Sequence, residues 1–294
     1  MRRAAEDARL AGADLLVATE LIVSGYPPKD MLLRDGFVAA CDRAVDELAA
    51  SVGSEMAILV GHPTHRDLPG RRVANAASLL YDGRVQTSVH KMLLPNYDVF
   101  DERRYFRSAA RVAPIEFRGR KLGVHICEDA WWGEPATTHH DDPAGWKDPV
   151  AELVAAGAEI LINLSASPFE IEKPNRRLGI VRRHVEKHRV PFVFVNQVGG
   201  NDDLVFDGNS FALNADEHEL VRMCAFRPDL RVIDLETAPP LAPAQPVRRE
   251  SLLLDALVLG LHDYMRKCGF SDCVLGLSGG IDSSLAAYIG ARAA

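Results

Sequence analysis

Short apolar runs of strand length recur along the chain and alternate with longer stretches that have the spacing of amphipathic helices. Apolar runs of about four to eight residues are typical of buried strands, whereas apolar positions three and four apart indicate one face of a helix. The predicted strands are Leu15–Thr19, Ala57–Gly61, Ala76–Tyr81, Arg84–His90, Lys121–Ile126, Glu159–Leu164 and Pro191–Asn196. The predicted helices are Met1–Ala11, Gly36–Ala50, Pro149–Ala156 and Pro174–Arg189. This alternation predicts an α/β fold.

The pattern of residues in the last third of the chain changes twice. Asn209–Leu213 and Glu219–Met223 have the pattern of a hairpin. Prolines and alanines are then concentrated between residues 237 and 250, which is typical of a semi-rigid linker, and a helical pattern follows over Ser251–Cys268. We therefore expect a first domain over residues 1–236, a proline-rich linker over 237–250 and the beginning of a second domain over 251–294.

The chain opens on a helical pattern that leads directly into the strand at Leu15. In an α/β domain a strand ordinarily precedes such a helix, so we expect the first domain to lack its first strand. The neighbouring strands would then expose unpaired backbone groups and an apolar edge, which favours aggregation. On this interpretation residues 1–294 express poorly or aggregate.

Charge and composition exclude several classes of protein. The 294 residues carry a net charge of −7, which argues against a nucleic-acid-binding surface. No apolar stretch approaches the ~20 residues of a membrane span. The five cysteines form no CxxC pair, so we interpret them as reduced thiols. We expect a cytoplasmic protein that binds neither nucleic acid nor membrane.

A glycine–serine turn near residue 280 has the features of a phosphate-binding loop. Residues 278–283 read SGGIDS and follow the apolar run Val274–Leu277, which predicts a buried strand. The two glycines let bare amide groups approach a ligand, and a helix predicted over Ser283–Arg292 points its positive end at the turn. No Gly-Lys-Ser/Thr sequence ends the loop, so it is not a Walker motif. It resembles the ATP loop of enzymes that adenylate a carboxylate or carbonyl and release pyrophosphate.

Three predicted strands end at residues suited to amide chemistry, namely Glu20, Lys91 and Cys127. Because the carboxyl ends of parallel strands meet at one edge of a sheet, we expect these side chains to lie together. The carboxylate can take the thiol proton, and the ammonium group can stabilise a thiolate and later an oxyanion. The residues alone leave open whether Cys127 is this nucleophile or a thiol of the core.

The sequence around these residues resembles a known family. Residues 20–30 read ELIVSGYPPKD, 91–106 read KMLLPNYDVFDERRYF, 126–132 read ICEDAWW and 195–211 read VNQVGGNDDLVFDGNSF. They resemble the nitrilase-type glutaminase domain of glutamine-dependent NAD+ synthetases, and VLGLSGGIDS at 274–283 resembles the start of their synthetase domain. The resemblance implies a nitrilase-like αββα sandwich, followed by the first strand, loop and helix of a Rossmann-like ATP-pyrophosphatase domain.

The resemblance also implies a role for each matching residue. Glu20 corresponds to the general base, Lys91 to the catalytic lysine and Cys127 to the nucleophile that forms a thioester with glutamine. The implied glutamine-binding residues are Tyr97, Glu102, Ser167 and Lys173. The implied ATP-binding residues are Gly276, Leu277, Ser278, Gly279, Gly280, Ile281, Asp282 and Ser283.

The activity implied by the resemblance is that of a ligase. Ammonia released from glutamine would amidate deamido-NAD+ in a reaction that uses ATP, with Mg2+ in the complete enzyme and no cofactor for the glutaminase step. A homo-oligomer is expected. Two alternatives stay open: a free-standing amidase of the nitrilase family, and a scaffold without catalysis that regulates a synthetase. The linker and the ATP loop argue against the first, and the intact set of three residues argues against the second.

Two groups of histidines indicate metal sites only weakly, and we predict no metal site. His184 and His188 are four residues apart, but they lie in a strongly charged helix, which we interpret as a solvated face. His139, His140, Asp141 and Asp142 belong to residues 137–148, which resemble an insertion after the nucleophile strand. We interpret those four residues as part of a flexible loop.

Overall fold

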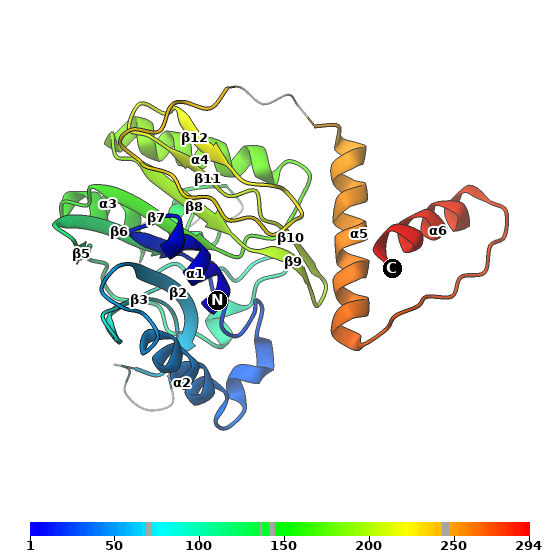
Figure 1. Cartoon of the computed structure of the whole chain (residues 1–294), viewed down its shortest axis with the longest axis horizontal. Coiled ribbons are helices and arrows are strands. Elements are labelled where there is room, and N and C mark those ends of the chain that lie inside the picture. The colour runs from blue at the N-terminus through cyan, green and yellow to red at the C-terminus, as the bar shows by residue number, and fades with distance from the viewer. Residues whose placement is uncertain (67, 69–71, 136, 141–144, 243–246) are drawn as a thin grey trace.

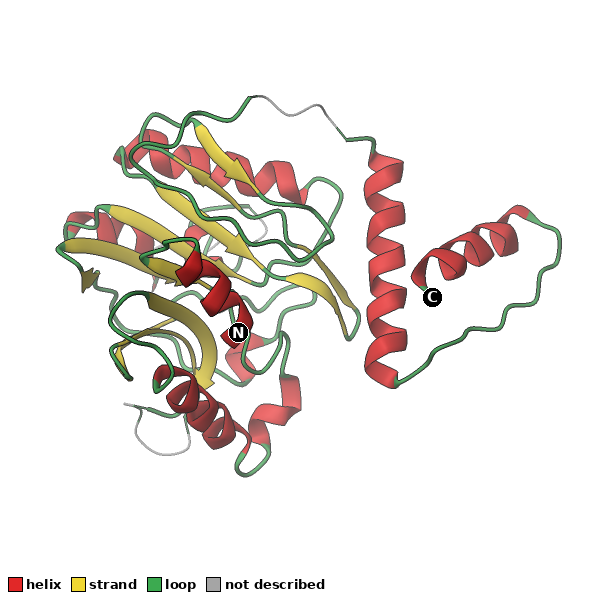
Figure 2. Cartoon of the chain, viewed as in Figure 1, coloured by secondary structure: helices red, strands yellow, loops and turns green. Residues whose placement is uncertain are grey.

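The computed structural model describes residues 1–66, 68, 72–135, 137–140, 145–242 and 247–294. Its larger part is a four-layer sandwich, in which two sheets lie face to face and helices cover the outer face of each (Figure 1). Figure 2 shows the same arrangement by type of element. The αββα fold expected from the sequence is confirmed.

The first sheet has the strand order β1-β2-β3-β4. Its strands are β1 (Leu15–Val17), β2 (Ala57–Thr64), β3 (Ala74–Tyr81) and β4 (Arg84–His90). Helices α1 (Arg2–Leu10) and α2 (Phe37–Ala49) cover its outer face through a cluster that includes Ala8, Val45 and Ile58. The apolar spacing of α2 places Val38, Cys41, Val45 and Leu48 on one buried face, as the sequence pattern predicted.

The second sheet has the strand order β12-β11-β8-β7-β6-β5. Its strands are β5 (Ile115–Phe117), β6 (Arg120–Ile126), β7 (Ile160–Ser165), β8 (Phe192–Asn196), β11 (Phe211–Leu213) and β12 (Glu219–Arg222). Helices α3 (Pro149–Ala155) and α4 (Lys173–His188) pack on its outer face around Val150, Val181 and Phe192. Between the two sheets lies a further apolar layer that contains Leu59, Leu79, Val124 and Ile162.

The two sheets are mixed, which corrects the expectation of one parallel sheet. Among the described strands, β1 and β2 are parallel, as are β6, β7 and β8, whereas β3 and β4 form antiparallel pairs. Glu20 therefore follows a strand of the first sheet and Cys127 a strand of the second. The residues meet because ends of the two stacked sheets converge, and not because they share one sheet edge.

A hairpin that the sequence pattern did not predict links the sandwich to the C-terminal helices. Strands β9 (Val198–Asn201) and β10 (Leu204–Asp207) form this antiparallel pair. Helix α5 (Arg249–Cys268) packs on it, because Gly200 and Gly260 allow the two backbones to approach closely. Asp263 of α5 accepts a hydrogen bond of 2.7 Å from the amide of Gly200. Part of the predicted linker, residues 243–246, lies outside the described residues.

The strand predicted over Val274–Leu277 is absent. This segment has no regular structure, and Val274 is fully exposed. A strand needs a neighbour to pair its backbone groups, and no described strand lies beside this one. The helix after the loop does form, as α6 (Ile281–Ala293). No helix in the described part of the chain is long and apolar enough to cross a membrane.

Candidate active site

Cys127 lies at a sharp turn between strand β6 and the short helix η3 (Cys127–Ala130). Its φ angle is +43°, in the left-handed region that residues other than glycine seldom adopt. Such strain is concentrated at functional sites, where the surrounding structure holds it in place. Burial, assisted by the charge of Glu20, raises the pKa of the Cys127 thiol well above its usual range, and Lys91 only partly opposes this. The thiol is therefore protonated at rest and needs a base.

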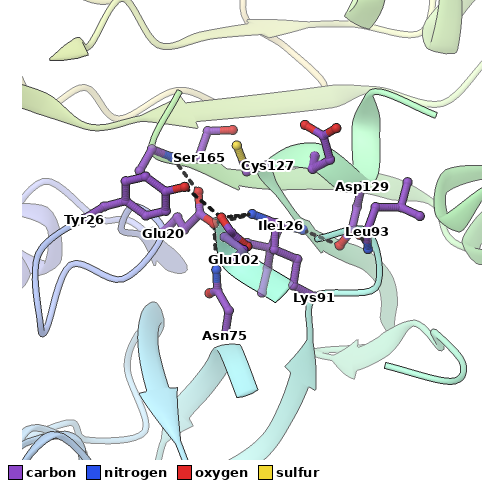
Figure 3. Close-up of polar contacts among 12 residues, drawn as sticks. Glu20, Tyr26, Asn75, Lys91, Leu93, Glu102, Ile126, Cys127, Asp129 and Ser165 are labelled. Atoms are coloured by element: carbon purple, nitrogen blue, oxygen red, sulfur yellow. Dashed lines mark hydrogen bonds and ion pairs between the residues drawn. The ribbon is translucent and has the colours of Figure 1, made fainter. Parts of the chain in front are cut away.

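Lys91 is the centre of the polar contacts beside Cys127. It follows strand β4, and its side chain is completely buried. The Lys91 nitrogen donates to Glu20 Oε1 at 2.7 Å and to Glu102 Oε1 at 2.8 Å (Figure 3). Burial alone lowers the pKa of Lys91, but the charges of Glu102 and Glu20 outweigh it and hold the pKa well above its usual range. Lys91 is thus a permanent cation in a buried site.

The carboxylate of Glu20 is held from both sheets. Asn75 on β3 donates to Glu20 Oε1 at 2.7 Å, and the amide of Ala166, just after β7, donates to Glu20 Oε2 at 2.8 Å. These hydrogen bonds, together with the one from Lys91, fix the position of the Glu20 carboxylate close to the nucleophile strand. The sequence pattern gave no indication of Asn75.

Glu102 faces Lys91 from the short helix η2 (Glu102–Arg104). Its Oε1 accepts hydrogen bonds from Lys91 and, at 2.8 Å, from the hydroxyl of Tyr26. Burial raises the pKa of Glu102 to about 7, against the opposing charge of Lys91. These contacts place Glu102 at the lysine. Tyr26 was not among the residues that the sequence indicated.

Asp129 joins the segments that carry the lysine and the cysteine. Its Oδ1 accepts from the amides of Met92 and Leu93 at 3.0 and 2.8 Å, and its Oδ2 accepts from the amide of Ile126 at 3.0 Å (Figure 3). Met92 follows Lys91 and Ile126 precedes Cys127, so one buried carboxylate fixes both backbones. Asp129 stands in the quoted ICEDAWW motif together with Ile126, but its other two partners, Met92 and Leu93, lie far away in the sequence.

Glu128 forms a second acidic position next to the nucleophile. It is buried, and its carboxylate accepts the hydroxyl of Tyr97 at 2.9 Å. Burial raises the pKa of Glu128 to about 7, although Lys91 opposes this. The amino group of Lys173 lies 5.6 Å from the ring centre of Phe100, and burial lowers its pKa. Tyr97 and Lys173 therefore both lie in the surroundings of Cys127, together with Glu128.

Ser167 is also buried, in the loop between β7 and α4. Its hydroxyl oxygen accepts a hydrogen bond of 3.1 Å from Arg177 Nε, and its amide donates to Asn196 Oδ1 at 2.8 Å. Asn196 is the last residue of β8, so the ends of β7 and β8 contribute to one edge of the site.

The glycine–serine loop is not part of the cluster around Cys127. It lies beyond α5, on the side away from the sheets (Figure 1). The amide of Ser278 donates to Ser283 Oγ at 3.2 Å, and Ser283 Oγ donates to the carbonyl of Gly280 at 3.1 Å, where α6 begins. The loop residues are exposed apart from Ser283, which is half-buried. A glycine-rich turn at the positive end of a helix is a suitable place for a phosphate group.

Both weak histidine signals need correction. His184 does not lie on a solvated face: it stacks on Phe192 and bonds to the carbonyl of Ala130 at 2.8 Å, because that side of α4 faces the sheet. His139 is buried rather than part of a flexible loop, and its ring bonds to the carbonyl of Trp131 at 2.9 Å. Asp141 and Asp142 lie outside the described residues. Within the described ranges, no three His, Cys, Asp or Glu side chains form a metal-binding group.

Comparison with known proteins finds relatives for both parts of the chain. A glutamine-dependent NAD(+) synthetase of Synechocystis is 42% identical, and the match covers 99% of this chain and 53% of that protein. One from Rhodobacter capsulatus is 39% identical over 97% of this chain and 50% of its own length. This chain thus spans about half the length of the curated relatives that it matches. The resemblance stated from the sequence motifs is confirmed over nearly all of the chain.

Solved structures and family models agree with this relationship. The structure of a glutamine-dependent NAD+ synthetase from Acinetobacter baumannii, in complex with ADP, has a TM-score of 0.87 and 32% identity, covering 99% of this chain and 53% of that one. A carbon-nitrogen hydrolase from Helicobacter pylori shares the fold, with a TM-score of 0.61, 22% identity and coverage of 76% and 78%. The family model for NAD synthase matches residues 253–294. The model for carbon-nitrogen hydrolase matches residues 1–223, and on this match the chain belongs to the carbon-nitrogen hydrolase family.

Proposed function

We propose that this chain provides the glutamine-hydrolysing part of a glutamine-dependent NAD+ synthase, with Cys127 as the nucleophile. The observation that carries the proposal is the buried Lys91, which lies between the carboxylates of Glu20 and Glu102 beside the strained cysteine. A buried cation with two carboxylates and a thiol supplies a base, an oxyanion partner and a nucleophile in one place. The match to named synthetases supports glutamine as the amide.

The chemistry begins with proton transfer from the Cys127 thiol to Glu20. The thiolate attacks the side-chain amide carbon of glutamine, and Lys91 stabilises the resulting oxyanion. The carbon–nitrogen bond then breaks, Glu20 returns its proton to the leaving nitrogen, and ammonia departs from a thioester. In the second half, Glu20 takes a proton from water, and the hydroxide attacks the thioester. The carbon–sulfur bond breaks, Glu20 returns its proton to the departing thiolate, and glutamate leaves the restored Cys127 thiol.

Recognition of glutamine uses the polar groups around the nucleophile. Its α-ammonium group is complementary to the buried carboxylate of Glu128, which Tyr97 orients. Its α-carboxylate is complementary to Ser167 and Lys173. A plain aliphatic amide cannot make these contacts, and a site built to hydrogen-bond its substrate discriminates strongly against an analogue that lacks the bonding groups. Glutamine is therefore favoured over simple amides.

The C-terminal region supplies the connection to ATP. In this proposal residues 1–236 form the glutaminase domain, 237–250 the linker and 251–294 the beginning of the synthetase domain. The loop from Gly276 to Ser283 holds the phosphates of ATP, which Mg2+ accompanies. ATP adenylates the carboxylate of deamido-NAD+, and ammonia displaces AMP to give NAD+. We propose a cytoplasmic homo-oligomer. The NAD synthase match over residues 253–294 supports this assignment.

The proposal is tested by ammonia release from glutamine and by trapping of the thioester with hydroxylamine. The unaltered chain should release ammonia and yield the glutamyl hydroxamate, and Cys127→Ala should do neither. Cys224→Ala is the matched control, because Cys224 is only half-buried and lies outside the cluster. Glutaminase turnover in Cys127→Ala would reject the thioester mechanism.

The same assay separates the alternatives. A free-standing amidase would hydrolyse a simple aliphatic amide as well as it hydrolyses glutamine. A scaffold without catalysis would release no ammonia from either, although its Cys127 could still be alkylated. Only a glutaminase should hydrolyse glutamine faster than it hydrolyses the simple amide.

A further inference from the structure

Arg177 on helix α4 is one of the most deeply buried charged residues of the molecule, with 2% of its surface exposed. Its guanidinium group has five N–H donors, and all three nitrogens make hydrogen bonds. Nη1 forms two bonds to the carboxylate of Asp207, at 2.7 and 2.9 Å. Nη2 donates to the carbonyls of Ser167 and Pro168 at 2.8 and 3.0 Å. Nε donates to Ser167 Oγ at 3.1 Å.

Four of these contacts can be explained by structure alone. The pair with Asp207 joins α4 to strand β10, and the two carbonyl contacts hold the loop after β7 in place. A buried charge needs such a partner and such hydrogen bonds. The bond to Ser167 Oγ differs from these four contacts, because Ser167 is one of the residues proposed to bind glutamine.

That bond determines the direction in which the Ser167 hydroxyl can act. A hydroxyl has one hydrogen to donate and can accept hydrogen bonds as well, whereas a guanidinium group donates only. Arg177 therefore uses the oxygen of Ser167 as an acceptor and leaves its hydrogen free. No acceptor for that hydrogen is found among the described residues. The adjacent backbone is also fixed, because Asn196 bonds to both the amide and the carbonyl of Ser167.

We propose that Arg177 is a positioning residue for substrate recognition, which sets Ser167 as a hydrogen-bond donor to the α-carboxylate of the substrate. This rests on the proposed glutaminase function and deepens it. A carboxylate accepts hydrogen bonds and cannot donate them, so it is the group that a hydroxyl fixed in this way selects. Arg177 does not touch the substrate, and it acts through Ser167.

The first test is Arg177→Lys, which keeps the positive charge opposite Asp207 but loses the planar fork of donors. We expect KM for glutamine to rise by about 10- to 100-fold, the scale of one charge-assisted hydrogen bond. We expect kcat to change by less than about threefold, as with loss of binding common to ground and transition states. Alkylation of Cys127 by iodoacetamide should keep its rate, because the nucleophile is untouched. Arg176→Lys, on the exposed side of the same helix, is the control.

A double-mutant cycle separates positioning from a general structural role. If Arg177 acts through Ser167, then Arg177→Lys should raise KM no further in a Ser167→Ala background. If the increases in KM caused by Arg177→Lys and Ser167→Ala multiply in the double variant, the proposal is overturned. If Arg177→Lys does not fold, the neutral pair Arg177→Gln with Asp207→Asn avoids an unpaired buried charge and should show the same rise in KM.

Different outcomes test the proposed glutaminase function and the role of Arg177. A parent chain without glutamine turnover would reject the proposed function and this recognition role with it. Turnover in the parent together with an unaltered KM in Arg177→Lys would reject the role of Arg177 alone. A large fall in both kcat and the alkylation rate would show that Arg177 maintains the whole site, which also contradicts the proposal.

Discussion

The amino nitrogen of Lys91 lies 2.7 Å from Glu20 Oε1, and both side chains are completely buried. Glu102 contacts the same nitrogen from the other side, so one cation is shared by two carboxylates. Two carboxylates that lie this close together, buried away from water, cannot both remain ionised unless a cation lies between them. Lys91 therefore has a structural task, holding the two acids together, besides the catalytic one proposed for it.

Lys91→Met should destabilise the fold, and more so at high pH. Loss of one partner of a buried ion pair costs about 3–5 kcal/mol. Burial raises the pKa of Glu102 from 4.5 to about 7 even with Lys91 opposing it. Without Lys91 this pKa rises further, so the folded state holds a proton that the unfolded state has lost, and stability falls as pH increases. The fall in Tm relative to the parent should be larger at about pH 8 than at about pH 5.5. Equal falls would contradict this, and Lys121→Met, at an exposed position, is the control.

Glu20→Gln should abolish glutamine hydrolysis, although Glu102 still pairs with Lys91 in this variant. The amide can still accept from Asn75 or Ala166, but it cannot take the thiol proton. We expect the glutaminase rate to fall at least ~100-fold, the scale of a general base. Glu47→Gln, on the exposed face of α2, should have no effect. The measurement is single-turnover ammonia release, and a loss below about tenfold would remove Glu20 from the mechanism.

Asp129→Asn should loosen the link between the lysine and the cysteine. An amide cannot accept at both ends, so either Ile126 or the pair Met92 and Leu93 loses its acceptor. One unsatisfied buried amide costs about 1–3 kcal/mol. We expect a lower Tm and an altered rate of Cys127 alkylation. Asp98→Asn, at an exposed position nearby, should change neither, and an Asp129→Asn variant with parental values would refute the link.

Glutamine binding should strengthen as pH rises through neutrality. Burial raises the pKa of Glu128 to about 7, so below this pH the position is mostly neutral and attracts an ammonium group weakly. The value of kcat/KM for glutamine should therefore rise through about pH 7. Because Glu102 also titrates near this pH, Glu128→Gln is needed to separate the two. Glu128→Gln should raise KM for glutamine and make KM less dependent on pH. If the pH profile of KM is unchanged in this variant, Glu128 does not bind the α-ammonium group.

Gly200→Ala should weaken the docking of α5. A Cβ atom at this position would lie 3.1 Å from the Cα of Gly260, which is backbone and cannot turn aside. The helix must then shift, and the hydrogen bond from the Gly200 amide to Asp263 weakens with it. We expect faster proteolysis within the linker at residues 237–250. Gly53→Ala, where a Cβ meets no atom within 4 Å, is the control.

The main strands and the catalytic candidates were predictable because each carries a local signal. A buried strand reads as an apolar run, and a polar residue at its end is conspicuous, as with Glu20 and Lys91. Hairpin β9–β10 has no such signal, because Gly199, Gly200 and Asn201 disrupt the apolar alternation that marks a strand. The segment Val274–Leu277 shows the reverse: it has the composition of a strand but lacks a described neighbour to pair with.

The supporting residues of the site could not be found from local pattern. Asn75 is one polar residue within a buried strand, and its meaning comes from Glu20, which is 55 positions away in sequence. Tyr26 and Asp129 likewise act on groups that only the folded chain brings near. Their signal is a buried polar atom with a specific partner, which is a property of three-dimensional packing and not of spacing along the chain.

The contact between the hairpin and α5 also bears on how such proteins diverge. Gly200 lies in the region matched by the hydrolase family and Gly260 in the region matched by the synthase family. A larger side chain at either position would push the hairpin and the helix apart. Asp263 would then lose its hydrogen bond with the amide of Gly200. In this chain the two halves are therefore coupled at this contact and are not independent modules. A chimaera joined within the linker should work only when hairpin and helix come from the same parent.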